Sequence, residues 1–425
     1  MVEQYKARVL DTQLKRKLSG IGAVLIEGPK LCGKTTTAEQ IAKSILYMAL
    51  PEDRVENIKM AQMAPGILLQ GETPRLIDEW QIAPGLWDSV RFEIDHRGKT
   101  GQFILTGSAV PAKRDEIFHT GTGRIAWLRM RPMTIFESGE SNGDVSLRTL
   151  FESDEDPIGK NYLELADIAY LVCRGGWPTA CEQKGEIALD RAFDYYDAVV
   201  NEDISRVDEV RRSPERAKLL MRSYARNQGT QTSIEAIRQD MIANDLDSLD
   251  AKTVQSYIDA LKKIFVIEDL PAWNPNIRSK TAIRTTDTRY FIDPSIGTAA
   301  LGIGPADLIN DLKTFGLMFE TMCVRDLRVY AEALGGSVYH YRDKNGLECD
   351  AVIHLRNGSY GLIEIKLGGE DAIEYGASTL KKLNGIIDTS KMNKPSFMAV
   401  LTGVGKYAYR REDNVYVIPI GCLRD

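Results

Sequence analysis

Short apolar runs alternate with helical spacing in the first third of the chain. Residues 23–27 (AVLIE) lead into a glycine loop, and residues 35–50 (TTTAEQIAKSILYMAL) have the apolar spacing of a helix. Two more apolar runs, around Ile77 and Leu105, flank a helical segment at residues 86–98. Strands that alternate with helices predict a parallel α/β sheet.

The pattern changes after Phe136. Polar and small residues there predict a linker or surface insertion, and residues 161–226 have helical spacing broken by a GGWP turn at residues 175–178. Helical segments and then two strand-like runs (FVIEDLPAW and RYFIDPSIG) within residues 213–301 are typical of a winged helix-turn-helix. From about Phe315 we expect a helix, three strands, a helix and two strands.

Residues 28–35 (GPKLCGKT) fit the phosphate-binding pattern GxxxxGK[ST] between a strand and a helix. The glycines let backbone N–H groups face phosphate oxygens, and the helix adds its positive N-terminus. We expect Lys34 to reach the β and γ phosphates of ATP and the Thr35 hydroxyl to ligate Mg²⁺. An ordinary glycine turn is the alternative. The predicted nucleotide-binding residues are Gly28, Pro29, Cys32, Gly33, Lys34, Thr35 and Thr36.

Carboxylates and a hydroxyl end the next two apolar runs. Asp78 is predicted to hold the magnesium, and Glu79 to orient or deprotonate an attacking water, because neighbours on a strand point to opposite sides. A solvated acidic strand end is the alternative. Ser108 could touch the γ-phosphate or the water, while Arg124 and Arg129 could neutralise transition-state charge at a neighbouring subunit.

A second acidic set lies near the C-terminus. Glu364 and Lys366 share one face of a strand, antiparallel pairing could bring Asp350 beside them, and Glu320 lies on the preceding helix. Such carboxylates could ligate Mg²⁺ while the lysine polarises a water that attacks a phosphodiester. The alternatives are a surface salt bridge, or a nuclease-like fold that binds without cleaving.

The predicted winged helix has a candidate DNA-binding surface. Residues 251–265 place Val254, Tyr257, Ile258 and Leu261 on a core stripe and leave a polar face, which could enter a major groove. A positive wing could contact phosphates. A protein-binding role and a solvated loop are the alternatives. The outward residues are Lys252, Gln255, Ser256 and Lys262, and the wing residues are Arg278, Lys280, Arg284 and Arg289.

Several segments occur in a fixed order along the chain: GPKLCGKTT, LIDEWQ, FILTGSA, GGWP, RYFIDPSIG, and ECD with EIK. Together they resemble the AAA-type ATPases of bacteria and archaea that end in a domain of unknown function. The resemblance implies an AAA+ nucleotide core, an oligomer in which one subunit's arginine completes the next site, and a C-terminal domain similar to the PD-(D/E)xK nuclease fold. It places Lys34, Thr35, Asp78, Glu79 and Ser108 at the Walker A, Walker B and sensor positions, and Arg124 in the family's Gly-Arg pair.

We therefore expect an α/β protein with four parts. They are a P-loop AAA-type ATPase core at residues 1–137, a helical lid and linker at 138–212, a winged-helix domain at 213–302 and a PD-(D/E)xK nuclease-like domain at 303–425.

The amino-acid composition limits the kinds of partner and the cellular compartment that we expect. Lys and Arg number 54 against 60 Asp and Glu, so the net charge of −6 excludes attraction of nucleic acid by bulk charge, and any contact needs a local basic surface. The 6 cysteines and 4 histidines form no zinc or disulfide pattern, which favours a reducing compartment. Without an apolar signal core or a long apolar run, we expect a cytoplasmic protein with no membrane anchor.

Two functions remain open. The first is an ATP-hydrolysing motor or switch that acts on nucleic acid, with ATP and Mg²⁺ as cofactors. The winged helix and the nuclease-like domain, a possible metal-dependent nuclease, would be its DNA-handling parts. The second is an ATP-dependent regulatory protein that assembles with a protein partner, with the terminal domain as a non-cleaving platform. A small-molecule kinase is disfavoured, because Glu79 beside Asp78 suits activation of water.

Overall fold

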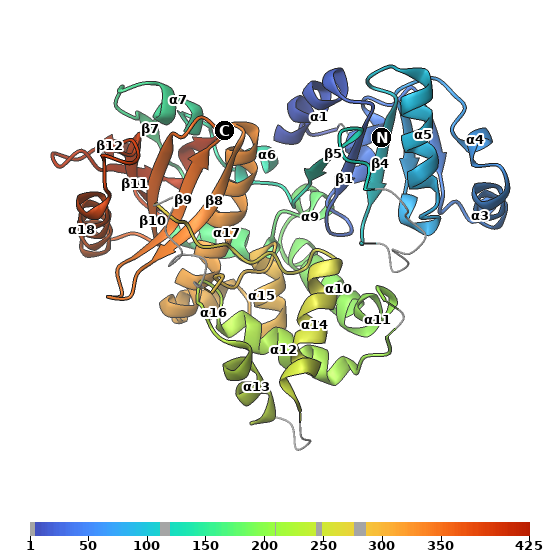
Figure 1. Cartoon of the computed structure of the whole chain (residues 1–425). Coiled ribbons are helices and arrows are strands. Elements are labelled where there is room, and N and C mark those ends of the chain that lie inside the picture. Colours follow the sequence, from blue (N-terminus) through green and yellow to red (C-terminus); the bar gives the residue numbers. More distant parts are fainter. Residues whose placement is uncertain (1–4, 111–119, 209, 244–248, 276–285) are drawn as a thin grey trace. The chain divides into compact units, whose positions relative to one another are not determined.

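The computed structural model describes residues 5–110, 120–208, 210–243, 249–275 and 286–425. The chain divides into two compact units. The first unit comprises residues 1–132, 201–212 and 258–266, and the second comprises residues 133–200, 213–257 and 267–425. Figure 1 shows the elements of each unit along the chain.

A five-stranded sheet of order β2-β3-β4-β1-β5 forms the first unit, and every neighbouring pair in it is parallel. Its strands are β1 (Ala23–Glu27), β2 (Ser44–Tyr47), β3 (Arg75–Asp78), β4 (Phe103–Gly107) and β5 (Ile125–Arg129). Within residues 1–132 the helices are α1 (Val9–Gly20), α2 (Lys34–Glu39), α3 (Arg54–Met63), α4 (Pro65–Leu68), η1 (Trp80–Ile82) and α5 (Leu86–Arg97). Since the strands are parallel, the loops that follow β1, β3 and β4 meet at one edge of the sheet.

The helix predicted at residues 35–50 is much shorter in the structure. Helix α2 ends at Glu39, and residues 44–47 form β2, which pairs with β3 at the edge of the sheet. The side chains of β2 alternate between half-buried and exposed positions, as an edge strand requires. A short apolar run is compatible with either a helix or a strand, and only the pairing with β3 decides between them.

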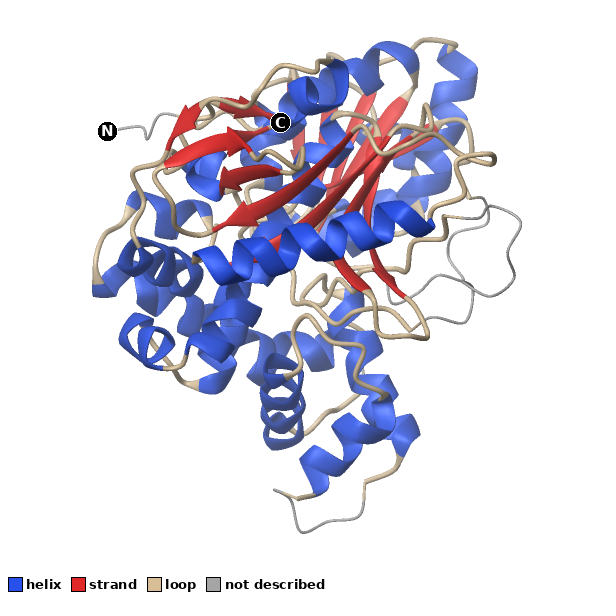
Figure 2. Ribbon diagram, turned by 90° about the vertical axis from the view of Figure 1, so that its left-hand side faces the viewer, coloured by secondary structure: helices blue, strands red, loops and turns tan. Residues whose placement is uncertain are grey.

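A seven-stranded sheet of order β7-β12-β13-β11-β10-β9-β8 lies in the second unit, beside a small pair of β14 with β6. Helix α17 packs on β8, β9 and β10, and α18 packs on β9, β10 and β11. Figure 2 shows the strands in red against the helices in blue. The strands are β6 (Val145–Ser146), β7 (Gly159–Lys160), β8 (Gly336–Arg342), β9 (Glu348–Leu355), β10 (Tyr360–Lys366), β11 (Phe397–Thr402), β12 (Tyr407–Arg410), β13 (Tyr416–Pro419) and β14 (Leu423–Arg424).

The remaining helices follow in chain order. They are α6 (Ile135–Ser138), α7 (Leu147–Glu152), α8 (Leu165–Arg174), α9 (Pro178–Glu182), α10 (Glu186–Ala198), the π-helical η3 (Val199–Asp203), α11 (Ile204–Arg206), α12 (Pro214–Arg226), α13 (Ile234–Ile242), α14 (Ala251–Lys263), α15 (Pro294–Leu301), α16 (Pro305–Asn310), α17 (Leu312–Ala333), α18 (Glu370–Ile386) and η5 (Ile420–Cys422). Within the described ranges, none of the helices combines the length and the apolar character needed to cross a bilayer.

Two expectations about the second unit need correction. Within the predicted linker, β6 pairs with β14 and β7 pairs with β12, so this stretch adds strands to the C-terminal part of the chain. The predicted second strand of the winged-helix hairpin stops early, because Asp293 caps α15 and Pro294 occupies its first turn. Among the described residues, the antiparallel pairing of these two runs consists of the bridges Ile267–Phe291 and Leu270–Thr288, and residues 276–285 between the runs lie outside the described residues.

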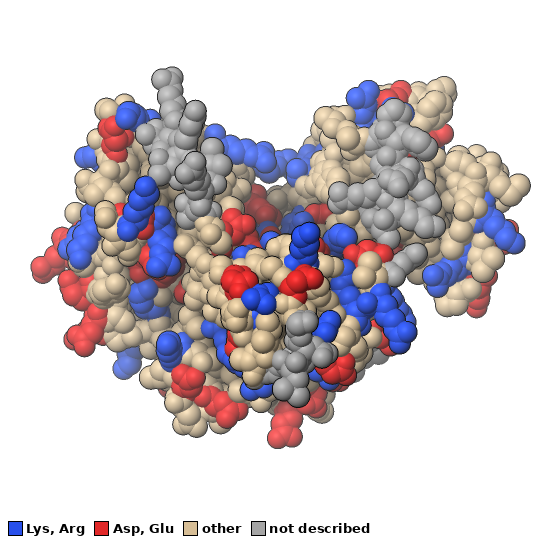
Figure 3. Space-filling model, turned by 60° about the horizontal axis from the view of Figure 1, so that its bottom comes forward, with Lys and Arg blue, Asp and Glu red and all other residues tan. Residues whose placement is uncertain are grey.

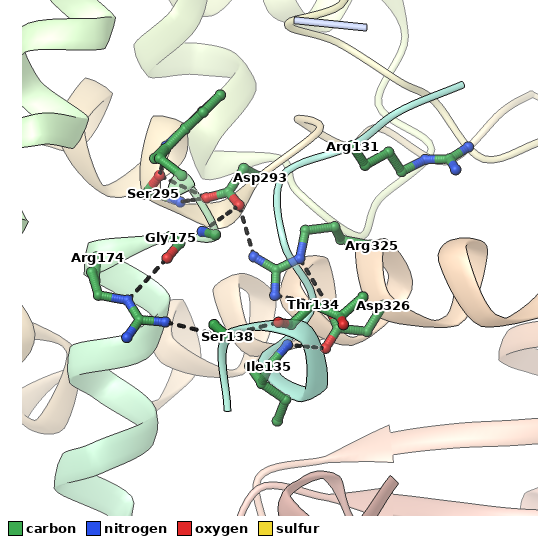
Figure 4. A network of polar contacts seen from close by, with 12 residues as sticks. Arg131, Thr134, Ile135, Ser138, Arg174, Gly175, Asp293, Ser295, Arg325 and Asp326 are labelled. Carbon is green, nitrogen blue, oxygen red and sulfur yellow. Dashed lines mark hydrogen bonds and ion pairs between the residues drawn. The ribbon is translucent and has the colours of Figure 1, made fainter. Parts of the chain in front are cut away.

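A buried ion network joins distant parts of the second unit (Figure 4). The Arg325 guanidinium of α17 lies 2.7 Å from a carboxylate oxygen of Asp293 and 2.7 Å from one of Asp326. Asp293 also accepts from the backbone N–H of Gly176 at 3.0 Å, and Asp326 accepts from that of Ile135 at 3.1 Å. Burial raises the pKa of Asp326 to about 6. The GGWP turn and the segment after Pro132 are therefore both tied to α17.

Replacing Arg325 by methionine should lower the free energy of unfolding by about 3–5 kcal/mol, because Asp293 and Asp326 would stay buried without their cation. Urea unfolding followed by tryptophan fluorescence measures the change. Arg148→Met is the matched control: the Arg148–Glu152 pair is 53% and 64% exposed, so its loss should cost at most about 0.5 kcal/mol. Equal midpoints for the two variants would contradict a structural role for the network.

Candidate functional site

The loop after β1 has the backbone that phosphate binding needs. Gly33 adopts a left-handed conformation with φ of 98°, and a Cβ on Gly28 would lie 2.0 Å from the carbonyl oxygen of Met130. Lys34 is buried, and its Nζ donates to the carbonyl oxygens of Gly28 at 3.1 Å and Pro29 at 2.7 Å. The ammonium is thus held inside the loop, where a polyphosphate could take over its hydrogen bonds.

Arg8 supports this loop from outside, and no sequence motif marks it. Its guanidinium donates to the carbonyl oxygen of Cys32 at 2.9 Å and to that of Arg131 at 2.8 Å. Cys32 is buried, and its Sγ lies 3.7 Å from the carbonyl oxygen of Met130. Among the other predicted nucleotide-binding residues, Pro29 is buried, Thr35 is half-buried and Thr36 is exposed at the start of α2.

Asp78 links the loop to the neighbouring strands. Its Oδ1 accepts from the Thr35 hydroxyl at 2.6 Å and from the Thr106 hydroxyl at 2.7 Å. A magnesium ion on ATP would be held by the Thr35 hydroxyl and, through water, by the Asp78 carboxylate. Because these two groups lie one hydrogen bond apart, the residues present fit a nucleotide-bound Mg²⁺.

Glu79 lies beyond the end of β3, in a left-handed conformation with φ of 54° and ψ of 49°. Its N–H donates to the Thr106 hydroxyl at 3.2 Å, and its Oε2 accepts from the Ser108 hydroxyl at 3.0 Å and from the Gln81 amide. Asp78 and Glu79 do face different partners as predicted, but the backbone turn at Glu79 separates them, not the alternation of a strand. Holding a non-glycine residue in this left-handed conformation costs about 1–3 kcal/mol of conformational free energy, and such residues are concentrated at functional sites.

The two predicted arginines lie at opposite ends of β5. Arg124 precedes the strand and pairs with Asp95 at 2.9 Å, so it lies at the edge of the sheet away from the phosphate-binding loop of its own chain. Arg129 ends the strand, where its Nε donates to Glu27 at 3.1 Å and its guanidinium lies 4.3 Å from the centre of the Phe265 ring. Arg124 is therefore not placed to reach a nucleotide held by the phosphate-binding loop of its own chain.

Three residues of the C-terminal acidic set, Asp350, Glu364 and Lys366, lie in contact. β9 pairs antiparallel with β10, and Asp350 accepts from the N–H of Ile365 at 2.7 Å. The Lys366 ammonium lies 3.0 Å from Asp350 and 2.7 Å from Glu364, and Glu320 on α17 accepts from the hydroxyl of Tyr290. Asp350, Glu364 and Lys366 thus form an ion-paired cluster, and the Glu320 carboxylate is held by Tyr290.

Burial and the charge of Asp350 raise the pKa of Glu364 to about 8 and that of Glu320 well above its usual range. Burial alone would lower the pKa of Lys366, but Asp350 and Glu364 raise it. In the described part of the chain, no group of three or more His, Cys, Asp or Glu side chains is arranged to hold a metal. With the lysine between two carboxylates, the cluster as it stands does not fit a resident metal ion.

The predicted DNA-binding surface is only partly described. Val254, Tyr257, Ile258 and Leu261 are buried as expected, while Lys252 and Gln255 are exposed and Ser256 and Lys262 are half-buried. Arg278, Lys280 and Arg284 lie outside the described residues. Figure 3 shows basic and acidic side chains interspersed on the face that it presents.

Arg289 does not serve as the predicted phosphate contact. Its side chain is 9% exposed and its guanidinium lies 2.8 Å from Asp269, which is 2% exposed. Its Nε donates to the carbonyl oxygen of Thr232 at 3.2 Å. Arg289 is a buried structural cation, and its sequence neighbours gave no sign of this because the partner Asp269 is distant in the chain.

Comparisons with known proteins divide the chain into three matched regions. Residues 21–138 match the AAA domain, residues 165–307 match a domain of unknown function (DUF8612), and residues 315–423 match another domain of unknown function (DUF4143). The first match confirms the predicted AAA-type nucleotide core. The DUF8612 match spans the predicted boundary between lid and winged helix, and these boundaries stay predictions.

Similar proteins add little about function. Uncharacterized proteins of Mycobacterium tuberculosis and Mycobacterium bovis are each 23% identical over 357 residues, which cover 83% of this chain and 72% of the relative. A solved structure, a Walker-type ATPase of Pyrococcus abyssi, has a TM-score of 0.42 and 16% identity, and the match covers 68% of this chain and 94% of that chain. At this score the structural likeness supports no argument. The AAA domain, with the geometry above, supports an AAA-type ATPase.

Proposed function

We propose that this protein is a Mg²⁺-dependent ATPase of the AAA+ type that uses ATP binding and hydrolysis to drive or switch an action on nucleic acid. One observation carries the ATPase part. Lys34, the Thr35–Asp78 pair and the Glu79–Ser108 pair lie at the edge of the sheet where β1, β3 and β4 end.

Each of these groups has a defined task. The loop N–H groups and the Lys34 ammonium bind the phosphates, and Asp78 holds the Thr35 hydroxyl toward the metal position. When bound, Mg²⁺ neutralises charge on the β and γ phosphates. Glu79 takes the proton of the attacking water while Ser108 orients its carboxylate.

The action on nucleic acid rests on α14. Its apolar stripe is buried, so Lys252 and Gln255 remain on an exposed polar face that could enter a groove. A winged helix formed around α13 and α14, with the helices between residues 138 and 212 as a lid, would couple this face to the ATP state. Assembly with a protein partner is the alternative.

For the C-terminal domain we favour a non-cleaving binding platform over a nuclease. The Lys366 ammonium bridges Asp350 and Glu364, and the Glu320 carboxylate is engaged by Tyr290. These contacts stabilise the fold of the domain, and they leave no set of carboxylates among the described residues ready for a metal.

A homo-oligomer is also proposed, because the position of Arg124 allows a role only in trans.

Replacing Lys34 by alanine should abolish Mg²⁺-dependent ATP turnover, because the phosphates lose their buried cation. Glu79→Gln should keep ATP binding and lose turnover by at least about a hundredfold, since the amide cannot accept the water's proton. Steady-state phosphate release and binding of a fluorescent ATP analogue measure the two effects. Turnover at the parental rate in Lys34→Ala would overturn the assignment.

Single- and double-stranded DNA should stimulate ATP turnover, and the stimulation should fade as salt rises, because phosphate contacts release counterions. Lys252→Ala should weaken the apparent DNA affinity and reduce the salt slope by about one unit. Lys184→Ala, at an exposed position of the same unit, is the control and should match the parent. Turnover that is indifferent to both DNA forms would favour the protein-partner alternative.

Purified protein should not nick supercoiled DNA with Mg²⁺ or Mn²⁺, and Asp350→Ala should instead lower the thermal stability, because Lys366 loses one of its two partners. Gel assays and thermal unfolding test the two statements. Nicking by the parent that disappears in Asp350→Ala would show that the domain is a nuclease after all.

A further inference from the structure

Gln81, the last residue of the LIDEWQ segment, contacts the Glu79 carboxylate, although no phosphate, metal or water position of the proposed site has been assigned to it. It lies in η1, two residues after Glu79, and its Nε2 donates to Glu79 Oε2. The same nitrogen lies 3.5 Å from the Ser108 hydroxyl, which donates to the same Oε2 at 3.0 Å. Two donors therefore converge on one carboxylate oxygen, and no described residue donates a hydrogen bond to the other, Oε1.

The orientation of the Gln81 amide is fixed by chemistry. A carboxylate accepts hydrogen bonds and cannot donate them, so the amide must turn its nitrogen toward Glu79. Its Oε1 is then buried with no hydrogen-bond partner among the described residues. A buried acceptor that stays unpaired costs about 1–3 kcal/mol, which offsets what the hydrogen bond to Glu79 contributes to stability. A methionine of similar length would avoid that cost.

We propose that Gln81 is a positioning residue for ATP hydrolysis, which holds the Glu79 carboxylate so that Oε1 remains available to the attacking water. This inference rests on the proposed ATPase function. In the step concerned, the water oxygen bonds to the γ-phosphorus as the bond to the bridging β–γ oxygen breaks, and Glu79 Oε1 takes the water's proton. ADP leaves with the electron pair of the broken bond.

The backbone of Glu79 explains why a second donor is needed. Its left-handed conformation places the carboxylate beyond the strand, in a turn where Ser108 alone would leave it free to rotate about its other bonds. Gln81 lies two residues later in η1, so its amide can restrain the Glu79 carboxylate from a position close to it in the chain. Misplacement of a catalytic group by about 1 Å can cost a hundredfold in rate.

The test compares the parent with Gln81→Met by steady-state ATP turnover and thermal unfolding. We expect kcat to fall about tenfold to a hundredfold, KM for ATP to change by less than about twofold, and the melting temperature to stay equal or rise. Gln81→Leu is the second variant if methionine packs poorly. Gln70→Met, at an exposed loop position, is the matched control and should behave as the parent.

Two results would overturn the role of Gln81. One is an unchanged kcat, and the other is a fall in kcat that comes with a lower melting temperature and weaker ATP binding, as loss of a purely structural contact would give. Lys34→Ala separates this inference from the function on which it rests. If Lys34→Ala is inactive while Gln81→Met is fully active, only the inference fails, and if Lys34→Ala keeps parental turnover, the ATPase proposal fails as well.

Discussion

The carboxylate of Asp78 is the contact on which the nucleotide site depends. One of its oxygens accepts a hydrogen bond from Thr35, at the start of α2, and another from Thr106, near the end of β4. Since Asp78 itself ends β3, this one oxygen connects α2, β3 and β4. Thr106 in turn accepts from the N–H of Glu79. The loop at residues 28–35, the proposed metal position and the proposed catalytic carboxylate of Glu79 therefore depend on the same chain of hydrogen bonds, which exists only because β3 and β4 are parallel neighbours.

The second unit depends on a different kind of contact. Arg325 is buried with Asp293 and Asp326, and these carboxylates also accept from the backbone of Gly176 and Ile135. Breaking a buried pair leaves an uncompensated charge, so such a network restricts which segments can come together. The GGWP and IDPSIG segments are among those that resemble the AAA-type ATPases. Their contacts in this structure are explained by packing and charge around Arg325, not by chemistry at a nucleotide.

Much of the fold and of the ATP site could be predicted from local pattern. The strand–loop–helix around Lys34, the acidic end of β3 and the buried stripe of α14 are properties of a few neighbouring residues, and local propensity describes them well. The strand β2, the strands β6 and β7 and the burial of Arg289 could not be predicted, because each depends on a partner far away in the chain.

By itself, the sequence determined that a phosphate-binding loop, a carboxylate pair and a hydroxyl follow three strands of an AAA-type core, and that Asp350, Glu364 and Lys366 could share one region. Only the tertiary structure decided how these groups are used. In the structure, Glu79 lies outside the strand and accepts hydrogen bonds from Ser108 and Gln81. Arg124 lies at the edge of the sheet away from the phosphate-binding loop, and Lys366 lies between two carboxylates. The reason is physical: residue spacing sets which groups lie on one element, whereas hydrogen-bond geometry and burial are properties of contacts between elements.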